Sequence, residues 1–185
     1  FHANPQNDEW WGKGFTEWTN TSKARPRFKS HYQPREPHTD IGYYDLSEID
    51  TMAKQAELAK QHGIYGFCFY YYWFSGERLL EKPVDLLLKH PEIDLNFCLC
   101  WANENWTKAW DGQNRHILME QKYTDDDPIR FIDDLKVYID DPRYIRINGK
   151  PLIVVYNPGQ IPEINKVFAA WRKHAEELGL GEILI

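Results

Sequence analysis

The stretch Cys100–Trp106, CWANENW, places one carboxylate among two Asn and two Trp, directly after the apolar run 95–99. Carboxylates serve as general acids, bases or nucleophiles in sugar chemistry, amides hydrogen-bond hydroxyl groups, and indole rings cover apolar C–H faces. We therefore interpret Glu104 as a candidate catalytic residue of a sugar site. The alternative is that Glu104 caps the next turn or pairs with Lys108. The expected ligand contacts around it are Trp101, Asn103, Asn105 and Trp106.

A second dense group of aromatic and acidic residues lies at 7–18, NDEWWGKGFTEW. Gly12 and Gly14 let the backbone approach a ligand closely, although two such glycines alone are weak evidence for phosphate binding. Glycoside chemistry needs two carboxyl groups at a controlled separation, so a loop that brings Glu17 toward Glu104 would supply the second candidate catalytic residue. The alternative is that the Trp side chains only anchor the loop. The expected ligand contacts here are Glu9, Trp10, Trp11 and Lys13.

Two further groups of aromatic and polar residues follow strand-like runs. The end of FYYYWF offers hydroxyl groups and stacking faces, and the turn 110–112 offers an indole and a carboxylate. A core position and an ordinary Asp-Gly turn are the corresponding structural alternatives. The expected ligand contacts are Tyr70, Tyr72, Trp73, Trp110 and Asp111.

Alternation along 95–104 predicts how a strand would position Glu104. Successive side chains of a strand point to opposite faces, so the even-numbered residues from Asn96 to Glu104 share one face, and bulky Leu95, Phe97, Leu99 and Trp101 share the other. The smaller, partly polar set suits the interior of a barrel, and the bulky set suits packing under helices. Glu104 is then expected at the rim where barrel enzymes place catalytic groups.

The order of the predicted elements favours an α/β fold with a parallel sheet. Long polar loops follow the strands and short ones follow the helices, as in a (β/α)8 TIM barrel, which typically needs ~250 residues. We therefore expect 1–185 to form one partial domain, the N-terminal part of such a barrel, truncated before closure. The expected elements are a rim loop at 3–44, helices at 47–63, 83–90, 127–139 and 163–178, and strands at 64–72, 95–101, 151–156 and 182–185.

Composition narrows the expected partners. The chain has a net charge of −6 and no phosphate-binding footprint, so nucleic acid is not an expected partner. No apolar run reaches the roughly 18 residues of a membrane span, and Phe1 is not a natural start. Cys68, Cys98 and Cys100 lie in strand-like runs poorly placed for bridging, which favours reduced thiols and a cytoplasmic location. His spacing indicates no metal site, and no motif indicates a cofactor. Aromatic residues make up 15% of the chain and gather with amides and acids, which suits a glycan ligand.

Six stretches resemble the WbsX-type glycosyltransferases, whose domain is similar to glycoside hydrolase family 99. They are NDEWWGKGFTEWTN, HYQP, YDL, HGIYGFCFYYYWFSGERLLEKP, FCLCWANENWTKAWDG and DPRYIRINGKPLIVVY, and they occur in the family's order over nearly the whole chain. The resemblance implies a (β/α)8 barrel acting on glycans, commonly in bacterial surface-polysaccharide assembly such as O-antigen or capsule. The related hydrolases cleave internal mannosidic links.

One family motif of the N-E-W-x-E kind has no counterpart in this sequence. The resemblance places it in the later half of the barrel and makes it the expected home of the catalytic carboxylate pair, so the remaining half of the barrel is expected in the full-length chain. Glycosyl transfer from a sugar donor is the first interpretation, with this fragment inactive alone. Hydrolysis by the same architecture is the second. A carbohydrate-binding module without turnover is an alternative of another class.

Overall fold

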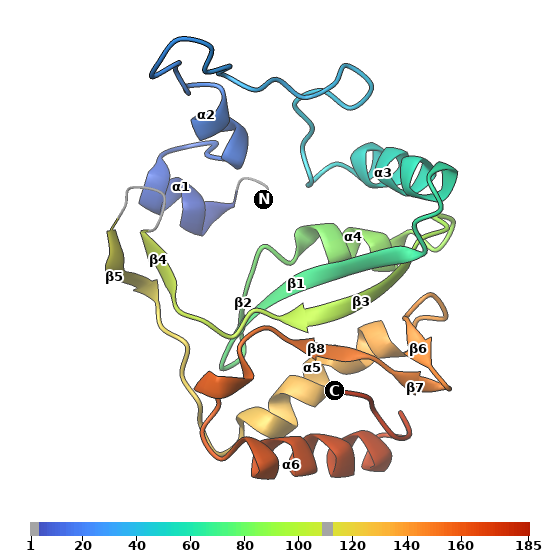
Figure 1. Cartoon of the computed structure of the whole chain (residues 1–185). Coiled ribbons are helices and arrows are strands. Elements are labelled where there is room, and N and C mark those ends of the chain that lie inside the picture. The colour runs from blue at the N-terminus through green and yellow to red at the C-terminus, as the bar shows by residue number, and fades with distance from the viewer. Residues whose placement is uncertain (1–3, 109–112) are drawn as a thin grey trace. The chain divides into compact units, whose positions relative to one another are not determined.

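The computed structural model describes residues 4–108 and 113–185 (Figure 1). Contacts group these residues into two units. Unit 1 holds the described residues up to Leu58 and residues 82–93, and unit 2 holds 59–81 and the described residues of 94–185. The position of one unit relative to the other is not determined, so each is described by itself.

Unit 2 is built on a four-stranded sheet with the order β2-β1-β3-β8. Strands β1 (Gly66–Phe74), β3 (Asn96–Trp101) and β8 (Ile153–Val155) are parallel, and the short β2 (Glu77–Leu79) pairs antiparallel with β1. Leu184 forms an isolated parallel bridge with Leu152 beside β8. The predicted α/β class with a parallel sheet is confirmed.

Helices α5 (Asp127–Ile139) and α6 (Ile164–Glu177) cover one face of this sheet (Figure 1). The odd-numbered strand residues face these helices. Tyr71 and Trp101, which are paired in register, both pack against the helices, and Phe131 of α5 stacks on Trp171 of α6 at 4.8 Å between ring centroids. Trp171 is 1% exposed, so these large rings form the centre of the core.

The even-numbered residues of the strands face the other way, and this face is only partly covered. Cys68 is exposed and Tyr70 is 53% exposed, whereas Cys98 and Cys100 on the neighbouring strand are buried. All three thiols are free. Within the described residues, the aromatic run of β1 is therefore buried mainly on one face, although its composition suits burial on both.

Unit 1 contains most of α3 and three other helices. The predicted loop at 3–44 holds two short helices, which is a correction: helix formation at Pro5 is set by Asn4, whose side chain accepts from the backbone N–H of Asn7 at 2.8 Å. Helices this short leave no periodic pattern to detect. The helices are α1 (Pro5–Trp11), α2 (Glu17–Thr21), α3 (Ile49–Gln61) and α4 (Lys82–Lys89).

Two hairpins and a turn of 3-10 helix complete the part of the chain that the structure describes. Strands β4 (Trp106–Lys108) and β5 (Gln113–Met119) pair antiparallel within the stretch that the sequence predicts to be a loop. Strands β6 (Arg146–Ile147) and β7 (Lys150–Pro151) flank the tight turn at Asn148–Gly149, where both residues have positive φ. The 3-10 turn is η2 (Pro158–Gln160).

Gly66 marks a close approach between β1 and β3. A Cβ atom added there would collide with the backbone carbonyl oxygen of Asn96, its partner in register. We expect Gly66→Ala to lower the free energy of unfolding by roughly 2 kcal/mol, measured by urea unfolding. Gly159→Ala is the matched control because its nearest neighbour atom would be 3.6 Å away. Equal effects in both variants would contradict the proposed collision.

His174 links α6 to α5. Its Nε2 lies 2.6 Å from Oδ1 of Asp133, and its Nδ1 lies 3.4 Å from Oε2 of Glu177. The hydrogen bond with Asp133 raises the pKa of His174 above its ordinary value, with a smaller contribution from Glu177 and with burial opposing it. The protonated imidazole therefore stabilises the helix pair.

Replacing His174 should give a pH-dependent loss of stability. We expect His174→Gln to lower the free energy of unfolding by about 1 kcal/mol in mildly acidic buffer, because the pair is partly exposed. The contribution is complete below the ordinary pKa of 6.5 and is lost as the pH rises through the higher folded-state value. Urea unfolding over a pH series measures this. Asp133→Asn should show the same profile, and a loss that is equal at every pH would count against the ion pair.

Candidate active site

A pocket of about 280 Å³ opens at the carboxyl ends of β1, β3 and β8 in unit 2. Three strand ends contribute to it because parallel strands finish at the same edge of the sheet, which is where α/β proteins bind ligands. Even-numbered positions supply its sheet side, since those side chains point away from the helices. We call it the aromatic pocket, and it is lined by Tyr70, Tyr72, Ala102, Glu104, Asn105, Trp106 and Tyr156.

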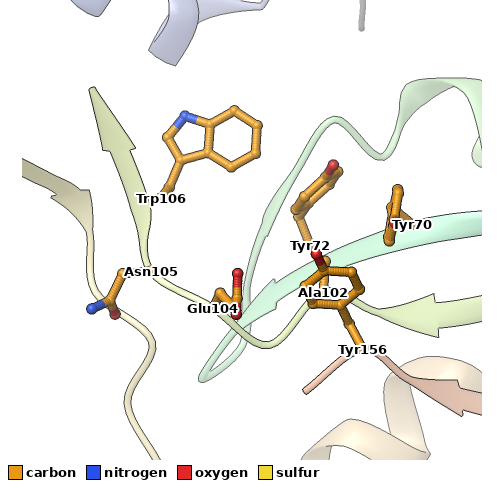
Figure 2. A pocket seen from close by; sticks show the side chains of 7 residues that line it. All are labelled: Tyr70, Tyr72, Ala102, Glu104, Asn105, Trp106 and Tyr156. Atoms are coloured by element: carbon orange, nitrogen blue, oxygen red, sulfur yellow. The ribbon is translucent and has the colours of Figure 1, made fainter. Parts of the chain in front are cut away.

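Four rings form a continuous wall of the aromatic pocket (Figure 2). Tyr156 contacts Tyr70 at 5.7 Å between centroids, Tyr70 contacts Tyr72 at 6.0 Å, and Tyr72 meets Trp106 edge-on at 5.0 Å. Tyr70 and Tyr156 are 53% and 54% exposed, so their faces remain accessible. Such a wall offers flat apolar surfaces next to hydroxyl groups, which suits the C–H faces and hydroxyl edges of a sugar ring.

Glu104 supplies the carboxylate of the pocket. Its Oε1 accepts a hydrogen bond from Nδ2 of Asn157 at 2.8 Å, and the residue is exposed. In Figure 2 the Glu104 side chain lies below Trp106 and Tyr72, between Asn105 and Ala102. Among the described residues it is the sole acid lining this pocket. Glu104 lies on a bend after β3, which ends at Trp101, so the alternation predicted along 95–104 does not extend to this residue.

Asn103 holds in place the backbone next to Glu104. Its side chain is fully buried, and its Nδ2 donates to the carbonyl oxygen of Asn157 at 2.7 Å while its Oδ1 accepts from the Asn157 N–H at 2.8 Å. The Nδ2 group also lies 3.2 Å from the hydroxyl of Tyr123, which donates to the Asn103 carbonyl at 3.1 Å. Burial raises the pKa of Tyr123, so this hydroxyl stays protonated. These hydrogen bonds form a clasp that holds together the chain segments that follow β3 and β8.

Asn105 positions the chain rather than the Glu104 carboxylate. Its Oδ1 accepts from the backbone N–H of Gln121 at 2.7 Å, and in Figure 2 its side chain points away from the aromatic wall. Although it lines the pocket, its carbonyl group is already used to hold the chain after β5. Asn103 does not line the pocket at all.

Trp73 and Trp101 lie in the core, which corrects their predicted contact with a ligand. Trp73 is 1% and Trp101 is 2% exposed, and the Trp101 indole N–H donates to the carbonyl oxygen of Trp73 at 3.0 Å. Both stack near Phe131 under the helices. The reason is alternation: odd-numbered positions of both strands face α5 and α6, so these rings cannot also face the pocket.

The remaining predicted residues belong to unit 1 or lie outside the described residues. Five of them belong to unit 1, in and after α1 and at the start of α2, where the acids and Lys13 are exposed. Trp110 and Asp111 lie outside the described residues. The five in unit 1 are Glu9, Trp10, Trp11, Lys13 and Glu17.

Tyr156 and Asn157 are not among the predicted ligand contacts, although Tyr156 is the last residue of the stretch DPRYIRINGKPLIVVY. Tyr156 ends the strand predicted at 151–156 and Asn157 follows it. The rule that polar and aromatic groups at parallel strand ends meet applies to both. Tyr156 is also an even-numbered strand position, like Tyr70. An aromatic residue at a strand end could therefore have indicated Tyr156, although no carboxylate lies beside it in the sequence.

The described residues were compared with the requirements of a metal site and of a membrane-spanning helix. In 4–108 and 113–185, no group of three or more His, Cys, Asp or Glu side chains has an arrangement that would hold a metal ion. None of the helices described combines the length and apolar character that crossing a bilayer requires.

Comparison with known families identifies the type of protein. The model of the family described as Glycosyltransferase WbsX matches residues 1–185. The chain belongs to the WbsX family. A protein of Xanthomonas campestris pv. campestris strain B100, called uncharacterized protein WxcX, is 46% identical over 183 residues, which is 99% of this chain and 26% of that protein. WxcX of strain ATCC 33913 matches with the same identity and coverage. This WbsX-family chain therefore spans about a quarter of the length of these relatives.

A solved structure titled "Glycoside hydrolase-like protein" shares the fold of this WbsX-family chain. The TM-score is 0.56 at 16% identity, over 80% of this chain and 46% of the other. At this identity the likeness concerns the fold alone.

Proposed function

We propose that this chain is the N-terminal part of a (β/α)8 barrel enzyme that transfers a glycosyl group during assembly of a bacterial surface polysaccharide, such as an O-antigen or capsule. The observation that carries the proposal is the aromatic pocket: a four-ring wall and the Glu104 carboxylate at the carboxyl ends of three parallel strands. Membership of the WbsX family supports transfer as the reaction. The three free thiols favour a cytoplasmic enzyme.

Each part of the pocket has a role in this proposal. Tyr70 and Tyr156 stack against the sugar ring, because their faces are the exposed ones in the wall. Glu104 assists proton transfer at the acceptor hydroxyl or at the leaving group, with Asn157 holding its carboxylate by the hydrogen bond at Oε1. We propose Glu17 of unit 1 as a second acid and Glu9, Trp10, Trp11 and Lys13 as further contacts from the long segment before α3. Trp110 and Asp111 complete the proposed rim.

Hydrolysis by the same barrel is the second candidate. The fold likeness to a glycoside hydrolase-like protein favours it. Hydrolysis uses two carboxyl groups across the scissile bond. Within the part of the chain that is described, Glu104 supplies the only carboxyl group that lines the pocket. The second group would then come from Glu17 or from the part of the longer protein that completes the barrel.

A product assay separates the two reactions. The full-length protein is incubated with the surface polysaccharide of its organism, with and without a panel of nucleotide sugars, and products are sized by gel electrophoresis and mass spectrometry. Transfer predicts products that lengthen only when a donor is present. Release of shorter sugars without any donor would reverse the ranking in favour of hydrolysis.

Removal of an exposed ring tests the binding wall separately. We expect Tyr156→Ala to weaken binding of polysaccharide fragments about tenfold in calorimetric titration, because one stacking face is lost. The melting temperature should not change, since the Tyr156 side chain is 54% exposed. Tyr65→Ala is the matched control, being 71% exposed and outside the pocket. Equal affinities for the two variants would remove Tyr156 from the site.

A further inference from the structure

A cationic segment lies in unit 1 between α2 and α3. Residues 23–36 carry five Lys and Arg side chains and a single acid, Glu36, in a chain whose net charge is −6. All five cations are exposed. The segment is therefore an open, positively charged loop in a chain that is acidic elsewhere. The cations are Lys23, Arg25, Arg27, Lys29 and Arg35.

The charge of the cationic segment is not compensated locally. Within the described residues, none of its five cations forms an ion pair. Lysines on the helices do: Lys54 pairs with Glu57, and Lys173 with Glu177. Lysines on helix surfaces are commonly paired with acids one turn away, and this loop lacks such partners. The segment thus presents a positive surface to a ligand.

A turn in the segment holds aromatic rings out into solvent among the cations. The His31 N–H donates to the Phe28 carbonyl at 3.1 Å, and the Arg27 N–H donates to Nδ1 of His31 at 3.3 Å. The Phe28 and His31 rings stack at 4.6 Å with an interplanar angle of 14°. Phe28 is nevertheless 68% exposed, and Tyr32 is 67% exposed. An aromatic ring held at a turn and left uncovered has an apolar surface available for burial against a partner.

We propose that the cationic segment binds the surface of an anionic lipid bilayer. Phosphate headgroups attract Lys and Arg, and aromatic rings settle at the level of the headgroups, so both features of the segment are satisfied at once. A sugar polymer fits less well, because sugar sites use carboxylate and amide acceptors for hydroxyl groups, and this segment has one acid. The inference concerns a surface separate from the aromatic pocket and does not depend on the proposed reaction.

Vesicle co-sedimentation of the full-length protein tests the proposal without any glycan. We expect binding to phosphatidylcholine vesicles with about 30% phosphatidylglycerol, little binding to pure phosphatidylcholine, and weakening as salt rises above about 0.1 M. Each cation near the surface contributes about a fivefold gain, so Arg25→Gln, Arg27→Gln and Lys29→Gln together should weaken binding about 100-fold. Phe28→Ala should weaken it about tenfold.

A matched control separates location from total charge. Lys54→Gln, Lys136→Gln and Lys173→Gln together remove the same charge from helix positions outside the cationic segment and should leave vesicle binding within about twofold of wild type. Unchanged melting temperatures show that the variants fold. Equal losses in the two triple variants, or equal binding to neutral and anionic vesicles, would overturn the proposal. The proposal would also be overturned if an oligonucleotide or heparin bound more tightly than the vesicles and that binding were unaffected by Phe28→Ala.

Discussion

Glu104→Gln should reduce glycan turnover by about 100-fold or more while leaving the protein folded. The amide oxygen of Gln can still accept from Nδ2 of Asn157, whose present distance to Oε1 is 2.8 Å, and the residue is exposed, so structure and stability should be kept. What the substitution removes is the negative charge and the ability to exchange a proton. The measurement is the product assay on the full-length protein, or restoration of the surface polysaccharide in a deletion strain, with melting temperature measured in parallel.

Three outcomes of this experiment carry different meanings. Lost turnover with retained glycan binding and an unchanged melting temperature supports a catalytic Glu104. Turnover close to wild type would remove Glu104 from the chemistry and leave it as a rim residue. A protein that binds glycan but never alters it, even as wild type, would instead be a carbohydrate-binding module. Glu120→Gln is the control, because Glu120 is an exposed acid outside the pocket.

Asn103→Ala should lower the stability of the protein more than the neighbouring substitution Asn105→Ala does. The substitution removes the buried amide that hydrogen-bonds both backbone groups of Asn157 and the hydroxyl of Tyr123. These partners then lose their hydrogen bonds to Asn103. Each buried polar group left unsatisfied costs roughly 1–3 kcal/mol, so we expect the free energy of unfolding to fall by about 3 kcal/mol. Chemical unfolding followed by tryptophan fluorescence measures the change.

The neighbouring asparagine provides the comparison. Asn105→Ala removes a single described hydrogen bond, to the Gln121 N–H, at an exposed residue, so its effect should stay near about 1 kcal/mol. If the two variants unfold at the same denaturant concentration, Asn103 is not the clasp that its hydrogen bonds indicate. A stable Asn103→Ala protein with normal turnover would also show that the strand ends do not need this clasp to hold Glu104.

Local patterns in the sequence predict those features that local chemistry determines. Hydrophobic periodicity predicts α5 and α6 at nearly their observed bounds, and alternation along 95–101 separates the two faces of β3 correctly. The same alternation does not extend to Glu104, because β3 ends at Trp101 and Glu104 lies on the bend that follows. Alternation also puts Trp101 on the helix side, whereas its residue type suggests a ligand contact; its burial shows that position decides.

Other features depend on contacts that no local pattern encodes. The buried role of Asn103 arises from Asn157, which is far away in the sequence and meets it only because β3 and β8 are neighbours in the sheet. Tyr156 joins the aromatic wall for the same reason. The helices α1 and α2 are too short for periodicity, and the hairpin of β4 and β5 lies in polar sequence that resembles a loop.

The alternation of side chains along β1 and β3 also limits how this protein can evolve. Substitutions at even positions such as Tyr70 and Ala102 alter the pocket, whereas the rings at odd positions such as Tyr71 and Trp101 hold the core. Ligand preference can therefore drift through single replacements that leave folding intact. A one-residue insertion within either strand would exchange the two faces and destroy both at once. Relatives with different glycan preferences should accordingly differ at the even positions and agree in length between strand start and strand end.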